Sequence, residues 1–470
     1  MTTTTPGPVT RDTAPPAAPA ASDRPAASPE SVVCPAALTH YDRELRQILA
    51  AAGEAAEAPA GFSPRWELPE PSPSLEKFFA PSTMSAHHLG ERAGTRLGLL
   101  NLMHNPRTRT TKTFASLVIV ARAVAHIRRT GEPIVIVTPS SANKATALRD
   151  AVLRAHETGL ATERELRIVC VLPSVSAAKL WDSPLTRDAA RRRAHPVAVS
   201  HGGGSAQVKE LARAVVDAEA DAVFAAHGVR LWHTMDLGNY MVADAVRALF
   251  ERDNLPRGPR VHAHAVSSAF GLLGHFHGQQ WHTGRQWPAE GAGYFLVQHL
   301  GTPDMVASLH HGSFDHRPEW EARDGLLVQD EDPRFPFAAH AADEQLDPTF
   351  YTHTPATSPR MNEIIRRQGG GGIVVSLVEC TERYPAIREL LAPHGVVLPS
   401  DPRRLREWSL VMALTGVLNA IDRGLLTDPE VLVHASGSYH SGDFRPVRDE
   451  HLRPVDSLDD LRALVRAAAA

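Results

Sequence analysis

The sequence has 470 residues, 43% of them hydrophobic, so it can bury a substantial core, and its length suggests two or three lobes. A net charge of -4 gives no electrostatic reason to expect binding to nucleic acid or to an anionic membrane. Cys34, Cys170 and Cys380 lie far apart and form no CxxC pair, which argues against a disulfide framework or a cysteine zinc site and suits a reducing cytosol.

The chain begins with a stretch that we expect to be a disordered tail, residues 1–36. The first thirty positions are mostly Pro, Ala, Thr and Ser, and such a segment cannot offset the entropy of ordering. It contains no hydrophobic segment of the kind found in signal peptides, and no apolar run in the chain approaches the length of a membrane span. We therefore expect a soluble, cytoplasmic protein with no membrane partner.

From residue 37 onward, the sequence predicts helices that alternate with buried strands. The expected helices are 37–58, 111–129, 142–159, 176–181, 205–220, 241–254, 271–281 and 407–424, and the expected strands are 131–141, 166–173, 195–200, 260–268 and 428–438. Such alternation indicates an α/β fold with mainly parallel sheets covered by helices, in which ligands bind at the carboxyl ends of strands. Residues 285–360 have weak periodicity and are interpreted as an insertion or lid.

Three polar turns and one lysine carry the predicted chemistry. Ser140, Ser141 and Asn143 follow one expected strand, Ser267–Gly271 follow another, and Ser436–Ser438 follow the last. Hydroxyls and backbone N–H groups at helix starts suit anionic oxygens and phosphate. Lys112 is one of only five lysines, and a lysine, unlike an arginine, can lose its proton and attack a carbonyl.

In their order along the chain, these motifs resemble the fold-type II pyridoxal-phosphate enzymes, the group of threonine synthase and the tryptophan synthase β subunit. The segment "TTKTF" stands where that group has an "SFKDR"-like lysine segment, and "SSANKA" where it has "SSGNTG"-like loops. "HAVSSAFG" is similar to the phosphate loop, and "LREWSLVMALTGVLNAIDRGLL" followed by "VLVHASGS" is similar to a Glu-containing helix and the turn after it. The resemblance covers about 85–445, with 285–360 fitting poorly.

The resemblance implies a two-lobed fold and a pyridoxal 5'-phosphate cofactor. Residues 37–112 would form the N-terminal part of the large lobe, 113–235 the small lobe and 236–470 the rest of the large lobe. The cofactor would be held by Lys112 as a Schiff base, by Asn143 near its phenolic oxygen, by Ser267, Ser268, Ala269, Phe270 and Gly271 at its phosphate, and by Ser436 at its pyridine nitrogen. The substrate would bind to Ser140, Ser141, Ala142 and Lys144. Relatives are often dimers, so a homodimer is expected.

The resemblance also implies a lyase or transferase reaction: β- or γ-elimination or replacement on an amino acid with an activated side chain. Thr113 and Phe114 replace the usual charged pair after the lysine, Ala142 and Ala145 replace loop glycines, and Lys144 replaces a threonine. Because this loop also grips the substrate carboxylate in the group, O-phosphohomoserine is not the expected substrate. A role in amino-acid metabolism is expected, and the composition would suit a specialised-metabolite pathway.

Several other interpretations stay open at this point. Lys144 is a rival for the cofactor lysine, and Gly369–Gly372 is a rival phosphate loop. "HGGG" at 201–204 is similar to an oxyanion-hole motif, but the chain has no GxSxG nucleophile elbow. A histidine-ligated metal hydrolase is suggested only by the close pairs His262/His264, His275/His277 and His310/His311, without HExxH, so no metal is predicted. A non-catalytic metabolite-binding relative of the same fold is the remaining alternative.

Overall fold

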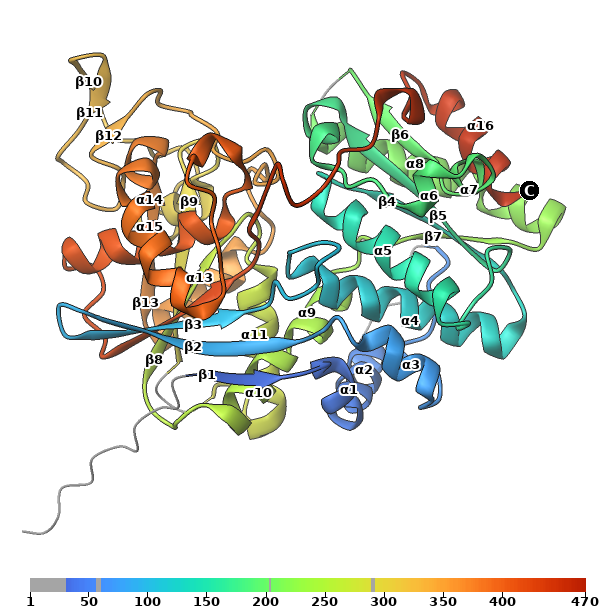
Figure 1. The fold of residues 1–470 in the computed structure, drawn as a ribbon, viewed down its shortest axis with the longest axis horizontal. Helices are drawn as coiled ribbons and strands as arrows, with labels where there is room; N and C mark the ends of the chain where they lie inside the picture. Colours follow the sequence, from blue (N-terminus) through green and yellow to red (C-terminus); the bar gives the residue numbers. More distant parts are fainter. Residues whose placement is uncertain (1–30, 56–60, 203, 289–291) are drawn as a thin grey trace, which may run out of the picture.

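The computed structural model describes residues 31–55, 61–202, 204–288 and 292–470, so the expected tail lies, up to residue 30, outside the described residues. Two α/β lobes lie side by side, and the chain passes between them several times (Figure 1). The predicted fold class, a two-lobed α/β protein with parallel sheets covered by helices, is confirmed.

The large lobe is built on a seven-stranded sheet in the order β1-β2-β3-β15-β8-β9-β13. Its strands are β1 (Ser31–Cys34), β2 (Met84–Arg92), β3 (Thr95–Asn101), β15 (Glu430–Ala435), β8 (Arg260–Ala265), β9 (Ala292–His299) and β13 (Gly370–Val375). The first three pair antiparallel, and every pair from β3 to β13 is parallel. The carboxyl ends of β3, β15 and β8 therefore meet at one edge of the sheet.

Helices cover both faces of this sheet because its strands are apolar on both sides. One face packs on α14 (Leu377–Leu391) and α15 (Ser409–Asp422), and the other packs on α11 (Phe270–Thr283), α12 (Asp304–His311) and α13 (Ser358–Gln368). The long helix expected at 407–424 is α15, and almost all its side chains are buried.

The small lobe has a five-stranded parallel sheet in the order β17-β6-β5-β4-β7. Its strands are β17 (Arg453–Pro454), β6 (Val197–Ser200), β5 (Leu166–Pro173), β4 (Ile134–Pro139) and β7 (Arg230–His233). One face packs on α5 (Asn143–Glu157), and the other on α8 (Ser205–His227) and α16 (Leu458–Ala469). The remaining helical turns are η1 (Ser174–Lys179), α6 (Pro184–Arg187) and α7 (Ala189–Ala194).

The C-terminal segment differs from its expected place in the large lobe. After β15 the chain crosses to the small lobe, where β17 joins the sheet edge and α16 packs against α8 (Figure 1). The apolar stripe of α16, formed by Leu461, Val465 and Ala468, is fully buried in the small-lobe core. Burial of this stripe explains the crossing, since the large-lobe sheet already has both faces covered.

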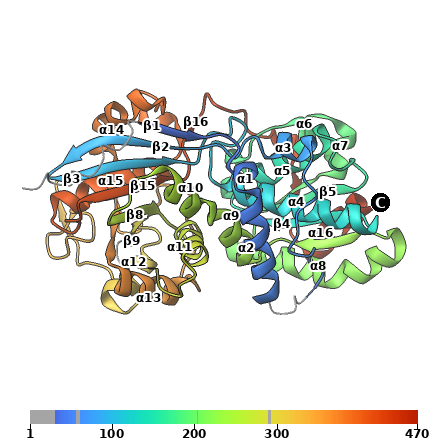
Figure 2. The ribbon, with the colours of Figure 1, turned by 90° about the horizontal axis from the view of Figure 1, so that it is seen from below.

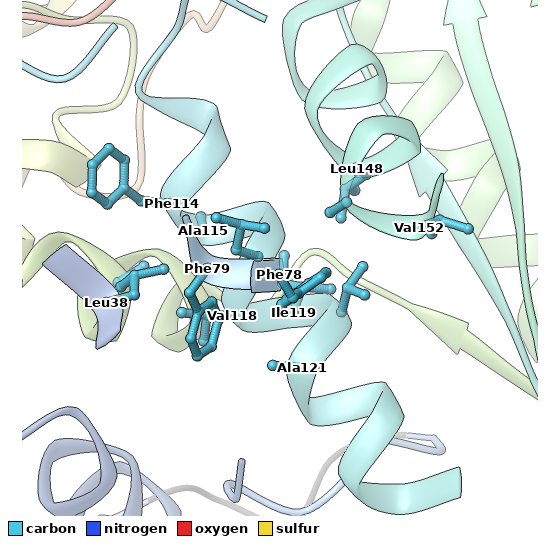
Figure 3. Close-up of a cluster of buried hydrophobic side chains, with 14 of the residues drawn as sticks. Leu38, Phe78, Phe79, Phe114, Ala115, Val118, Ile119, Ala121, Leu148 and Val152 are labelled. Atoms are coloured by element: carbon cyan, nitrogen blue, oxygen red, sulfur yellow. The ribbon is translucent and has the colours of Figure 1, made fainter. Parts of the chain in front are cut away.

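Helix α4 (Lys112–Thr130) lies between the lobes and is buried on all sides from Thr113 to Ile127. It ends at Gly131, which adopts a left-handed conformation with φ 75°. Its side chains Phe114, Ala115, Val118 and Ile119 belong to one buried hydrophobic cluster with residues from the N-terminal segment and from α5 (Figure 3). Those residues include Leu38, Phe78, Phe79, Leu148 and Val152. This packing fixes the position of Lys112, the first residue of the helix.

The N-terminal segment and two further helices complete this junction. They are α1 (Ala37–His40), α2 (Asp42–Ala55), α3 (Pro73–Phe79), α9 (Leu237–Asp244) and α10 (Val246–Asn254). Seen from below, α1 and α2 lie alongside α9 between the lobes (Figure 2). The single helix expected at 241–254 is thus two helices that meet at Ala245, and residues 31–36 of the expected tail contain an ordered strand, β1.

The region 285–360 is only partly the insertion that the sequence predicts. Its first part contains β9, a buried strand of the large sheet, and α12. The rest carries a small sheet of β10 (Glu321–Arg323), β11 (Leu326–Val328) and β12 (Ala338–Ala339), followed by a loop that reaches the lobe boundary. β9 was missed because it begins at the small residues Ala292 and Gly293.

The remaining short elements are β14 (Leu405–Glu407), β16 (Tyr439–His440), η2 (Ala392–His394), η3 (Pro402–Arg404) and η4 (Asp449–His451). β14 and β16 pair antiparallel and hold the turn after β15 in place. In the part of the chain that the structure describes, none of the helices combines the length and the apolar character that a membrane span requires.

Candidate functional site

A cavity of about 180 Å³ lies between the lobes, where the strand ends of both sheets meet. It is reached by the segments that follow β3, β15 and β8 in the large lobe and β4 in the small lobe. The structure brings eleven of the twelve predicted site residues to its wall: Lys112, Ser140, Ser141, Asn143, Lys144, Ser267, Ser268, Ala269, Phe270, Gly271 and Ser436. The twelfth, Ala142, is buried behind the loop and does not line the cavity.

Lys112 enters the cavity from the first turn of α4. Its Nζ lies 5.5 Å from the ring centre of Tyr240. Burial lowers the pKa of Lys112, and Arg247 lowers it further, against the opposing charges of Asp244 and Glu407. The backbone before it is fixed, because the Thr111 N–H donates to the Ser436 carbonyl at 2.8 Å. A lysine held in this way favours the uncharged amine, which is the nucleophilic form.

The loop Ser267–Gly271 leads from β8 into α11 and presents the start of a helix to the cavity. Ala269 has φ 53°, a left-handed conformation that costs free energy for a residue with a Cβ. Gly271 has no room for a side chain, since a Cβ there would lie 2.8 Å from Arg247 Nη2. The loop thus combines helix N–H groups with a guanidinium directly behind it, which suits a phosphate.

Arg247 is fully buried in α10 and holds several parts of the site together. It donates from Nη2 to Asp244 Oδ1 at 2.6 Å, from Nη2 to Thr111 Oγ1 at 2.9 Å, and from Nη1 to His434 Nδ1 at 3.0 Å. The first bond is a salt bridge that neutralises the charge of Asp244. Arg247 therefore ties the residue before Lys112 to the helix behind the loop Ser267–Gly271.

The loop after β4 is organised by the hydroxyl of Ser140. Ser140 Oγ accepts from the N–H of Ala142 at 3.1 Å and from that of Ala145 at 2.8 Å. Ala142 has φ 89°, so it keeps a backbone conformation that favours glycine although the sequence has alanine there. The loop therefore carries backbone strain at Ala142.

Asn143 is held by two side chains from the large lobe. Its Nδ2 donates to Glu407 Oε2 at 2.6 Å, and its Oδ1 accepts from the Tyr439 hydroxyl at 2.7 Å. Glu407 Oε1 also accepts from Ser409 Oγ at 2.5 Å. Because both ends of the Asn143 amide are engaged, its orientation toward the cavity is fixed.

Lys179 links the two lobes next to this amide. Its buried Nζ donates to Asp347 Oδ1 at 2.6 Å and to Glu407 Oε2 at 2.9 Å. Burial alone would lower the pKa of Lys179, but Asp347 and Glu407 outweigh it and raise that pKa above its ordinary value. The region 312–357 thus reaches the site through Asp347, and the ammonium joins it to the small lobe.

Ser436 offers a hydroxyl that has no partner. Its Oγ is buried at the cavity wall and makes no hydrogen bond within the described residues. A buried hydroxyl without a partner costs free energy, so a group of this kind at a cavity wall is suited to bind a polar atom of a ligand. Ser436 lies at the carboxyl end of β15, one strand away from the phosphate loop.

A buried histidine cluster below the site contains Glu251, His262 and His275, whose ligand atoms lie close enough to hold a metal ion. Because Arg247 donates to His434 Nδ1, the proton of neutral His434 lies on Nε2 and faces His262 Nδ1 at 3.1 Å. The proton of His262 is then on Nε2, directed at Glu251 Oε2, 3.6 Å away. A metal needs that nitrogen unprotonated. His275 Nε2 is hydrogen-bonded to Glu251 Oε2 at 2.7 Å, whereas His262 Nε2 makes no hydrogen bond among the described residues.

The other rival motifs have structural roles or lie partly outside the described residues. Gly370–Gly372 are in β13, where a Cβ on Gly370 would lie 2.0 Å from the Tyr294 carbonyl oxygen, so this run packs against β9 and cradles no phosphate. In "HGGG", Gly203 is outside the described residues. A second group of possible metal ligands, His311, His316 and Asp332, is partly exposed on the large lobe, away from the cavity.

Sequence reasoning missed several residues of the cavity wall. They include Lys209, Tyr240, Asp244, Arg247, His264, Tyr351 and Glu407. His264 is buried and neither ring nitrogen has a partner within the described residues. One signal was present for Asp244 and Arg247: two opposite charges three positions apart inside an apolar stretch, which indicates a buried ion pair.

Comparison with known proteins places the chain in a family. A model described as "Family of unknown function (DUF6002)" matches residues 33–469, so the chain belongs to this family. No curated protein sequence matches it.

Among solved structures, the chain is similar to a pyridoxal-phosphate-bound threonine synthase from Brucella melitensis, with 13% identity, TM-score 0.46, and coverage of 80% of this chain and 79% of that one. It is also similar to threonine deaminase isoform 2 from Solanum lycopersicum, with 13% identity, TM-score 0.48 and coverage of 90% and 87%. A pyridoxal 5'-phosphate-dependent aspartate racemase has 12% identity, TM-score 0.48 and coverage of 86% and 97%. These are proteins of the group that the sequence motifs resemble. Because the likeness is distant, the case for a function rests on the site itself.

Proposed function

We propose that this protein is a pyridoxal-phosphate-dependent enzyme that acts on an amino acid. The observation that carries the proposal is the convergence of three features on one cavity: the buried amine of Lys112, the helix-start loop Ser267–Gly271, and the unpartnered hydroxyl of Ser436. The three features come from segments more than 150 residues apart in sequence, yet each matches a different part of the cofactor. The residues therefore fit the group.

Each part of the cofactor has a residue that would hold it. Lys112 would hold it covalently through Nζ, the N–H groups of Ser268–Gly271 would bind its phosphate, and Ser436 Oγ would hydrogen-bond its ring nitrogen. Arg247, which is paired with Asp244, lies behind Gly271 on the phosphate side. Asn143, fixed by Glu407 and Tyr439, would face the phenolic oxygen.

The reaction that this arrangement favours is β- or γ-elimination or replacement. When bound, the cofactor supplies an electron sink for the pair left at Cα of the amino acid, and a hydroxyl rather than a carboxylate at its ring nitrogen weakens that sink, which disfavours transamination. Lys112 Nζ would accept the proton from Cα, and burial, which lowers the pKa of this amine, favours the uncharged form that can do so. Ser140, Ser141 and the start of α5 would bind the carboxylate of the amino acid.

The test is chemical trapping on the purified protein. A yellow protein whose colour is fixed by borohydride, followed by peptide mapping, should show a pyridoxyl group on Lys112. A pyridoxyl group on Lys144, or on no lysine, would overturn the assignment. Release of a 2-oxo acid and ammonia from amino acids with a leaving group on the side chain would then identify elimination.

A further inference from the structure

Lysines gather at the cavity in a chain that otherwise uses arginine for its positive charges. Of 49 basic residues only five are lysines, and three of these, Lys112, Lys144 and Lys209, line this one cavity. A fourth, Lys179, lies just behind the wall and is paired with Asp347 and Glu407. Lysine presents a compact, mobile ammonium, which suits a ligand better than a fixed structural contact.

Lys209 has an aromatic neighbour but no acidic one. It projects from α8, and its Nζ lies 4.9 Å from the ring centre of Tyr351, on the loop of the large lobe that closes the cavity. Within the described residues, the salt bridges made by lysines are those of Lys179 alone. Lys209 therefore lines the cavity without a carboxylate partner among the described residues.

Lys144 is buried and also lacks a carboxylate partner among the described residues. Its Nζ donates to the Thr234 carbonyl at 3.2 Å and lies 3.3 Å from Met235 Sδ. Burial, together with the charges of Lys112 and Lys209, lowers the pKa of Lys144 to about 7. Burying an ammonium without a counter-charge is costly, so this position favours the arrival of an anion.

The acidic residues of the cavity cannot supply that anion, because both are already engaged. Asp244 is paired with Arg247, and Glu407 binds Lys179, Asn143 and Ser409. The cofactor phosphate would face the loop Ser267–Gly271, and the α-carboxylate of the substrate would face Ser140, Ser141 and the start of α5. These two groups leave Lys144 and Lys209 without a partner.

We infer that the substrate is an amino acid with a second anionic group, a carboxylate or a phosphate, on its side chain, and that Lys209 together with Lys144 binds this group. The inference rests on the proposed function and adds a substrate class to it. Lys209 and Lys144 act as specificity residues: they attract and orient the side chain while Lys112 accepts the Cα proton.

The experiment measures amino-acid binding to the holoprotein through the absorbance of the bound cofactor. L-Aspartate, L-glutamate, O-phospho-L-serine and O-phospho-L-homoserine are each compared with the matched neutral amino acid, L-asparagine, L-glutamine, L-serine or L-homoserine. We expect at least one anionic member to bind about 10- to 100-fold more tightly than its neutral match, as charge-assisted hydrogen bonds imply. The carboxylate and phosphate pairs show which anion the site prefers.

Two variants and one control test whether Lys209 and Lys144 cause the preference for anionic amino acids. Lys209→Gln and Lys144→Gln should each reduce the preference for the anionic member about 10-fold, whereas Lys77→Gln, at an exposed lysine of α3, should leave it unchanged. If Lys144→Gln fails to fold, Lys209→Gln decides the question, since Lys209 is only partly buried.

Equal binding of anionic and neutral members, or an equal effect of Lys209→Gln on both, would overturn the inference. So would weaker retention of the cofactor by Lys209→Gln with the preference intact, because Lys209 would then serve the cofactor phosphate. If the purified protein showed no cofactor absorbance, the proposed function itself would be contradicted. This result is seen before any amino acid is added, so it is distinct from a failure of the inference.

Discussion

The two walls of the cavity differ in how their charges are balanced. On the large-lobe wall, Arg247 is buried, paired with Asp244, and hydrogen-bonded to Thr111 and His434. On the small-lobe wall, Lys144 and Lys209 have no carboxylate partner among the described residues. The charges of the large-lobe wall are thus paired without a ligand, whereas the small-lobe wall carries two ammonium groups with no carboxylate beside them. A wall whose charges are already paired suits a permanently bound cofactor. A wall with unpaired positive charges suits an anionic substrate that binds and dissociates in each turnover.

Removal of Lys112 should have the largest effect, because we propose two roles for this residue, one toward the cofactor and one toward the substrate. Lys112→Ala should fold normally but lose roughly 10³-fold or more in turnover, since the covalent anchor and the Cα base are lost together. Turnover is measured beside cofactor content and the circular dichroism spectrum. Lys144→Ala is the matched control and should keep the covalently bound cofactor. Near-normal turnover in Lys112→Ala would move the chemistry to another residue.

Substitution of Lys179, whose ammonium joins the two lobes, should have the next largest effect. Lys179→Met should destabilise the protein by about 3–5 kcal/mol, because Asp347 and Glu407 stay buried without their counter-charge. The free energy of unfolding in denaturant is the measurement. Lys77→Met, on the exposed face of α3, should change it little. A loss below about 1 kcal/mol would show that water reaches the carboxylates.

The large-lobe wall can be tested at Gly271, in the loop that we propose binds the cofactor phosphate. Gly271→Asp should weaken retention of the cofactor about 100-fold, because it adds bulk beside Arg247 and a negative charge beside the phosphate. Equilibrium dialysis against free pyridoxal phosphate gives the dissociation constant. Gly258→Asp, at an exposed glycine with open space around it, is the control. Unchanged retention in Gly271→Asp would place the phosphate elsewhere.

Ser436 should show a smaller and more specific effect. Since its hydroxyl has no partner within the described residues, Ser436→Ala should leave the stability of the cofactor-free protein unchanged while it weakens cofactor binding roughly 3- to 10-fold. Thermal unfolding with and without pyridoxal phosphate separates the two quantities. A drop in the stability of the cofactor-free form would show that the hydroxyl has a structural role instead.

The smallest expected effect is a pH dependence of substrate affinity that arises at the small-lobe wall. Lys144 faces Lys112, Lys209, Tyr240, Cys170 and His233, and its pKa is about 7. Its ammonium is present below that pH and is lost as the pH rises through it. The affinity for an anionic amino acid should therefore fall roughly 3- to 10-fold as the pH rises through about 7.

The matched variant identifies the group responsible for that pH dependence. Lys144→Gln should remove the inflection, and Lys209→Gln should retain it. An unchanged inflection in Lys144→Gln would assign the titration to another group. Binding titrations of the anionic amino acid across this pH range provide the measurement for all three proteins.

The sequence by itself determined the elements whose signals are local. The buried strands β4, β5, β8 and β15 and the helices α4, α5 and α15 follow from apolar runs and periodicity, and polar turns at strand ends mark Ser140, Ser267 and Ser436. Strand ends gather ligands in parallel sheets, so a cavity lined by those turns was predictable. Ala142 shows the limit of a prediction from sequence, since only the structure shows its φ of 89°, a backbone conformation that favours glycine.

Only the tertiary structure decided what depends on partners distant in sequence. Glu407 holds Asn143 across 264 positions, and Arg247 holds His434 across 187, so no local pattern marks either contact. The same holds for α16, whose apolar stripe finds its place on α8 in the other lobe. Charge pairing is likewise a tertiary property. The sequence does not show which of its five lysines has a carboxylate partner, whereas the fold pairs Lys179 with Asp347 and places Lys209 at the cavity wall. Burial and neighbours, which the sequence does not specify locally, set the role of each charge.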